Sequence, residues 1–123
     1  MQTFTVTRVF ADQNGDSHFE DIEYPLNEAG PIGFLSASIS VKNMVFRKVS
    51  PNYDDFHPAP QRQFVVLLDQ GVEIESSLGE RRSFQPGEVL LMDDVTGKGH
   101  RSRNINPVER KSLFIILGDS PAI

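Results

Sequence analysis

Hydrophobic and polar residues alternate along most of this chain, which is typical of β-strands with one buried face. Phe4 and Val6 alternate with threonines, and serines at 36, 38 and 40 alternate with apolar residues. No window shows the 3.6-residue apolar period of an amphipathic helix. Many short strands separated by turn sequences predict an all-β sandwich or barrel. We expect strands at 3–10, 18–26, 34–41, 44–49, 63–68, 71–75, 88–92, 100–105 and 112–117, and a loop at 50–60.

One predicted strand begins with an unusual polar face. His57, Ala59, Gln61 and Gln63 occupy alternate positions where a proline-containing loop enters the apolar run 64–68. Alternate residues of an extended segment share a face. A histidine and two amides on one face of a buried strand require hydrogen-bond or ligand partners. The pattern therefore predicts a binding site where this loop meets its strand.

A second histidine, His100, also stands where a loop enters a strand. A Pro86-Gly87 turn precedes an apolar strand, a glycine-containing loop follows, and His100 enters the next strand. The acidic pair Asp93-Asp94 lies at the end of the apolar strand. Neighbouring residues in a strand point to opposite faces, so we interpret this pair as a turn element rather than a carboxylate dyad. The glycines at 97 and 99 suit turn geometry, since no helix follows to form a phosphate-binding loop.

Composition narrows the class of protein. At 123 residues the chain suits a single domain, 1–123. The net charge of −5 argues against a nucleic-acid partner, because phosphate binding requires a basic surface. The chain has no cysteine, which excludes disulfides, a thiolate nucleophile and cysteine-ligated zinc. Neither a signal-peptide pattern nor an apolar run of about 18 residues is present, so we expect a cytoplasmic protein without a membrane partner.

On these residues the sequence resembles the cupin superfamily over about 40–117. The first cupin motif is Gly, five residues, His-x-His, three or four residues, Glu, six residues, Gly. Its first histidine falls on His57, its second on Ala59, its glutamate on Gln63 and its closing glycine on Gly71. The second motif is Gly, five residues, Pro-x-Gly, two residues, His, three residues, Asn. Its matched positions are Gly87, Gly97, His100 and Asn104, with Val95 in place of the proline.

The resemblance implies an all-β fold: an antiparallel double-sheet β-barrel of the cupin or jelly-roll type, without substantial helix, in which the strands of 3–26 extend the sheet. It also implies a site built from three histidines and one glutamate. Two of those four positions are changed here, since Ala59 cannot coordinate and Gln63 offers only a neutral carbonyl oxygen. His57, Gln63 and His100 would then form a weak site for a divalent transition metal such as zinc, iron, nickel or manganese.

Three functions remain open at this point. The first is binding of a small polar molecule, such as a sugar or a carboxylate, at His57, Gln61, Gln63, His100 and Asn104. The second is a metal-dependent isomerase or dioxygenase, and the third is a structural or regulatory barrel. If the protein is a structural or regulatory barrel, both histidines are hydrogen-bonded interior residues, and Asn104 forms hydrogen bonds only to the backbone. We also expect a homodimer, with 3–10 as an exposed edge strand that pairs with a second subunit.

Overall fold

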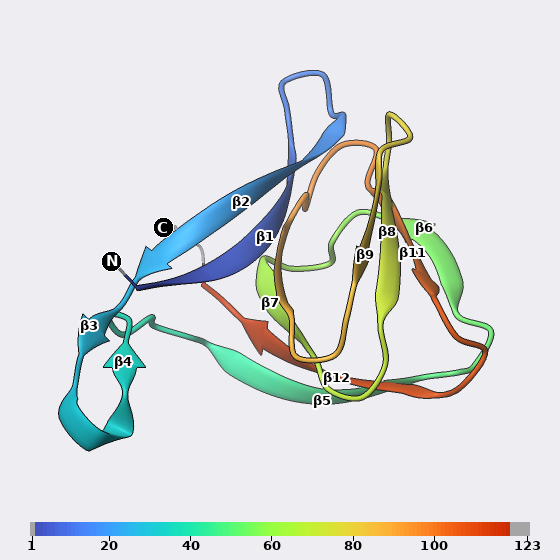
Figure 1. Cartoon of the computed structure of the whole chain (residues 1–123). Coiled ribbons are helices and arrows are strands. Elements are labelled where there is room, and N and C mark those ends of the chain that lie inside the picture. Colours follow the sequence, from blue (N-terminus) through green and yellow to red (C-terminus); the bar gives the residue numbers. More distant parts are fainter. Residues whose placement is uncertain (1, 119–123) are drawn as a thin grey trace.

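The computed structural model of the chain describes residues 2–118 and is all-β (Figure 1). A six-stranded sheet has the order β2-β1-β10-β7-β12-β5, and a four-stranded sheet has the order β6-β11-β8-β9. The large sheet contains β1 (Thr3–Ala11), β2 (Ser17–Pro25), β5 (Asn43–Val49), β7 (Gln63–Leu67), β10 (Val89–Asp93) and β12 (Arg110–Ile116). The small sheet contains β6 (Asp54–His57), β8 (Val72–Ser76), β9 (Arg81–Phe84) and β11 (His100–Asn104).

A short hairpin projects from the body of the molecule (Figure 1). It consists of β3 (Asn27–Glu28) and β4 (Phe34–Leu35), which pair with each other around the 3₁₀ turn Gly30–Ile32. That turn is the whole helical content of the described chain. Within residues 2–118 no helix has the length and apolar character needed to cross a membrane.

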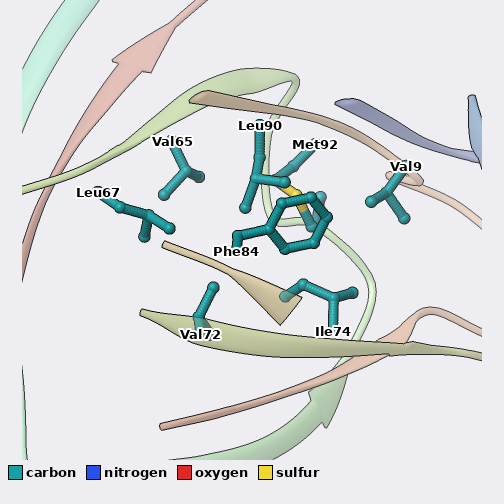
Figure 2. Close-up of a cluster of buried hydrophobic side chains, with 9 residues drawn as sticks. Val9, Val65, Leu67, Val72, Ile74, Phe84, Leu90 and Met92 are labelled. Atoms are coloured by element: carbon teal, nitrogen blue, oxygen red, sulfur yellow. The ribbon is translucent and has the colours of Figure 1, made fainter. Parts of the chain in front are cut away.

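The main core lies between the two sheets. Side chains from both sheets point toward one another there, with Phe84 between the two layers (Figure 2). The alternation of β7 and β10 supplies the large-sheet layer, and β8 supplies the small-sheet layer. The buried cluster is Val9, Ala59, Val65, Leu67, Val72, Ile74, Phe84, Leu90 and Met92. The opposite face of the large sheet buries a second cluster of Val6, Phe64, Leu91 and Leu117. Both faces of β7 and β10 are therefore apolar, which explains why these strands are almost uniformly hydrophobic.

The predicted all-β class and the lack of substantial helix are confirmed, with three differences in detail. First, β1 pairs in parallel with β10, so the large sheet is mixed rather than purely antiparallel. Second, the predicted strand at 34–41 is wrong beyond Leu35, because its alternating serines remain exposed without a strand partner. Third, two strands were not expected: β6, which lies in the expected loop at 50–60 and pairs with β11, and β9, which pairs with β8.

The expectation that 3–10 forms an exposed edge is wrong for the second half of this segment. β1 lies between β2 and β10 in the strand order of the large sheet. The backbone of Thr7–Phe10 is paired with both neighbours, whereas Thr3–Val6 are paired with β2 alone.

Candidate functional site

A cavity of about 210 Å³ lies between the two sheets, beside the main core. It is smaller than the roughly 300–1,000 Å³ pockets that hold drug-sized ligands, so it suits a small metabolite. Large-sheet strands supply one wall and β6, β8 and β11 supply the other. The lining residues are Arg47, Tyr53, Asp55, His57, Ala59, Pro60, Gln63, Val65, Val72, Ile74, Leu90, Met92, His100, Ser102, Arg110 and Phe114.

The two predicted histidines meet at one end of this cavity. His57 ends β6 and His100 begins β11, and they are direct neighbours in the antiparallel pairing. Their ring centroids are 5.2 Å apart. The close approach of the two chain segments depends on Gly99, which has φ +81°. A Cβ at Gly99 would lie 2.5 Å from the carbonyl carbon of His57, so a larger residue would push the two segments apart.

Asp94 orients His100. His100 Nδ1 lies 2.5 Å from Asp94 Oδ2, and both side chains are buried. An ionised carboxylate only accepts hydrogen bonds, so Nδ1 carries the proton and Nε2 is the nitrogen available to the cavity. The backbone carbonyl of Asp94 also accepts a hydrogen bond of 3.0 Å from the Ala59 amide. Asp94 thereby fixes both the His100 ring and the loop that follows His57.

His57 is held less tightly than His100. Its Nδ1 lies 3.1 Å from Asp55 Oδ2, but the two groups are not aligned for a hydrogen bond, and Nδ1 is buried without a partner among the described residues. Burial lowers the pKa of His57 below its usual value, and the nearby His100 lowers that pKa further. The carboxylates of Asp55 and Asp94 oppose this shift. The neutral form of His57 is therefore favoured at neutral pH, with one ring nitrogen able to accept a hydrogen bond.

Gln63 also lines the cavity, at the first position of β7, and only 3% of its surface is exposed. Within residues 2–118 no other group forms a hydrogen bond with the Gln63 amide. Ala59 lies beside it as part of the apolar core. A buried amide without a protein partner is expected to hydrogen-bond water or a ligand.

This donor set does not fit a resident transition metal. Stable sites for these metals use three or four nitrogen, sulfur or carboxylate ligands. Two imidazoles, one neutral amide and the Asp55 carboxylate line this cavity; Asp55 lies against His57 Nδ1, and the buried Asp94 carboxylate is already bound to His100 Nδ1. Nowhere in residues 2–118 do three or more His, Asp or Glu side chains gather in a metal-binding arrangement.

The two other predicted site residues lie away from the cavity wall. Gln61 is exposed and lies beside Lys42, Arg62 and Val95 on a separate surface depression. Asn104 ends β11, and its Nδ2 donates to the backbone carbonyls of Ser50, Pro51 and Val108. Its Oδ1 accepts a 3.0 Å hydrogen bond from Arg110 Nε. Asn104 therefore contributes by holding Arg110, which does line the cavity.

Sequence reasoning missed the charged members of the site. Asp94 was interpreted as a turn residue, yet it is fully buried and bound to His100. Arg110 and Arg47 were not singled out at all. A pattern for Arg110 does exist in the sequence, because it shares the inward face of β12 with Ser112, Phe114 and Ile116. An arginine at the start of such an alternating strand is a candidate interior cation.

Comparison with known proteins adds no assignment. Neither a scan against protein-family models nor a search of curated protein sequences found a match to this chain.

Proposed function

We propose that this chain is a small-molecule-binding protein of the cupin type, whose ligand occupies the cavity between the sheets. The proposal rests on one observation: among residues 2–118, the buried Gln63 amide lines this cavity without a hydrogen-bond partner. The His57 and His100 rings line the same cavity, and Asp94 sets the tautomer of His100. Leaving such a group unpaired costs about 1–3 kcal/mol. A ligand that hydrogen-bonds to these groups recovers part of that cost on binding.

The arrangement of the two histidines supports the cupin part of the proposal. They are far apart in the sequence, yet β6 and β11 bring them together on the inner face of the small sheet. His57 belongs to the first cupin motif and His100 to the second, and the resemblance implies that these two motifs lie side by side in the fold. The facing sheets agree with a jelly-roll architecture, although β6-β11-β8-β9 and the six-stranded sheet have no hydrogen-bonded ladder in common among the described residues.

A thermal-shift screen with a metabolite library tests the proposal. We expect at least one compound to raise the melting temperature of the wild-type chain, and His57→Ala to abolish most of that rise. His18→Ala is the matched control, because His18 lies outside the cavity and binds Asp12 at 2.6 Å. A library that shifts neither protein, or that shifts wild type and His57→Ala equally, would favour a structural or regulatory role.

The metal-dependent enzyme remains the second candidate, and the same screen separates it from the first. It requires a compound response that depends on added metal, whereas the proposed binding does not. The donor set described above favours metal-independent binding. In the absence of a metal, catalysis would rest on the histidines alone.

The homodimer also remains a prediction, now with a different surface. The outer face of the large sheet carries an apolar groove that continues onto the projecting β3-β4 hairpin. Phe4, Phe34, Leu35 and Val41 line it and are each about half exposed. Exposed apolar surface of this kind is typical of an interaction site, and a second copy is the expected partner.

A further inference from the structure

The cavity between the sheets contains cationic groups as well as the two histidines. Arg110 from β12 and Arg47 from β5 both line it. The length of β11 separates His100 from Arg110, because β11 begins at His100 and ends at Asn104, which accepts a hydrogen bond from Arg110. Four residues of extended strand span roughly 13 Å between Cα atoms. Arg110 is thus placed toward the Asn104 end of β11 and the His100 ring toward the other end, while the charge of Arg47 lowers the pKa of both Arg110 and His57 and therefore lies near both.

Neither of these arginines has a carboxylate partner. The chain contains eight arginines. Six of them form ion pairs with aspartate or glutamate: Arg8, Arg62, Arg81, Arg82, Arg101 and Arg103. In the described part of the chain, the two arginines without such a pair are the two that line the cavity.

Arg110 is the more unusual of the two, since only 1% of its surface is exposed. Its Nε donates to the neutral Asn104 amide, and the Tyr53 ring centroid lies 5.7 Å from its Cζ. Burial lowers the pKa of Arg110 to about 10, and the charge of Arg47 contributes to that shift. The side chain therefore remains cationic at neutral pH. Buried charges in proteins are normally paired, because desolvating a lone charge is costly.

Arg47 is fixed by aromatic rings. Its Cζ lies 5.0 Å from the Tyr53 ring centroid and 4.8 Å from that of Phe114. These contacts orient the guanidinium plane beside Arg110, where like charges repel. The charge of Asp69 acts on Arg110 and the Asp55 carboxylate also lines the cavity, but neither guanidinium forms an ion pair within residues 2–118, so the two cations form a site for an anion.

We propose that the cavity binds a small carboxylate, with the carboxylate group on Arg110 and Arg47 and the body of the molecule extending toward the histidines. A planar guanidinium fork matches a carboxylate in two parallel hydrogen bonds. Val65, Val72, Ile74 and Leu90 supply an apolar part of the lining that suits a short hydrocarbon body, and the paired Asp55 and Ser102 add polar groups beside it. His57, His100 and Gln63 then hydrogen-bond a second polar group of the ligand. This assignment rests on the proposed small-molecule function and specifies its ligand class.

Calorimetric titration of the full chain tests the assignment with a defined set of probes. The probes are linear C3–C6 mono- and dicarboxylates with and without a hydroxyl group, the matched primary amides, and inorganic phosphate and sulfate. We expect at least one carboxylate to bind, and its amide to bind at least tenfold more weakly. Arg110→Met should weaken carboxylate binding about thirtyfold or more, because one partner of a buried charge pair is removed.

Two further variants keep the result interpretable. Arg47→Met weakens binding in the same direction and provides the answer if Arg110→Met does not fold. Arg81→Met is the control, because Arg81 is an exposed arginine that pairs with Glu75 away from the cavity, and it should bind as wild type does.

The outcomes separate this inference from the proposed function. If neutral library compounds stabilise the chain and no carboxylate binds, the carboxylate assignment is wrong and the binding function stands. The assignment is also wrong if both cavity-arginine variants bind carboxylates as tightly as wild type, or if phosphate or sulfate binds in preference to every carboxylate. If neither charged nor neutral compounds bind, the proposed function itself fails.

Discussion

Removal of the Asp94 carboxylate should destabilise the protein more than its small size suggests. Asp94→Ala leaves His100 Nδ1 without its acceptor in a site where only 3% of His100 is exposed. The lost hydrogen bond to a charged group and the small cavity left by the side chain together cost about 3–5 kcal/mol. The same substitution also removes Asp94 Oδ1, which is buried without a hydrogen-bond partner, and thereby recovers about 1 kcal/mol or more. The net loss in the free energy of unfolding should be about 2–4 kcal/mol.

Asp94→Asn removes the negative charge of this side chain and keeps its shape. The amide oxygen can still accept from His100 Nδ1, but the amide nitrogen then occupies a buried position without an acceptor. We expect a loss of about 1–3 kcal/mol, smaller than that of the alanine variant. Asp21→Asn is the surface control: its carboxylate is 55% exposed and pairs with Arg82, so its loss should stay below about 1 kcal/mol.

Urea unfolding monitored by circular dichroism measures all three variants. The midpoint should fall while the slope stays constant, since the substitutions do not change the surface exposed on unfolding. For a domain of this size the alanine variant should melt roughly 8–16 °C below wild type. If both Asp94 variants lose less than about 1 kcal/mol, the buried pair is not a stabilising interaction and the reasoning is refuted.

Two other perturbations probe the histidine end. Gly99→Ala should lower the free energy of unfolding by about 2–5 kcal/mol, since it combines a left-handed backbone with a Cβ 2.5 Å from the His57 backbone. Gly79→Ala is its control: φ is +92° but nothing lies within 4 Å, so the cost should be about 1–2 kcal/mol, and equal losses in the two variants would contradict the close-approach argument. Because folding lowers the pKa of His57, the unfolded chain takes up a proton first as the pH falls through about 6.5. The contribution of His57 to stability is therefore complete above that pH and declines below it. The stability of wild type relative to His57→Asn, measured by urea unfolding at pH 7.5 and 5.5, should decrease at the lower pH, and a constant or increasing difference would contradict the lowered pKa.

Strand positions were largely predictable from the sequence, because a period of two in hydrophobicity follows directly from strand geometry. The strand at 72–76 is a clear example, with buried and less buried residues alternating. The segment 36–41 has the same alternation and is not a strand, since no neighbouring strand is placed to pair with it. Alternating hydrophobicity shows which side chains would be buried in a strand, whereas a strand also requires backbone hydrogen bonds to a neighbouring strand.

The candidate site, like the strands, was predicted only in part from the sequence. The spacing of motifs in the sequence was enough to select His57, Gln63 and His100, and all three line one cavity. Gln61 is predicted from its alternation with Gln63 and Asn104 from the motif spacing, but both lie off the cavity wall: Gln61 is exposed, and Asn104 binds Arg110.

Sequence alone determined the all-β class and the order of most strands. The charge of the cavity was decided by tertiary structure. Whether an arginine is paired depends on which carboxylates the folded sheets place near it, and strand neighbours such as β5 and β12 are not adjacent in the chain. Asp94, Arg47 and Arg110 become functional candidates only when the two sheets close over them and remove their charges from water.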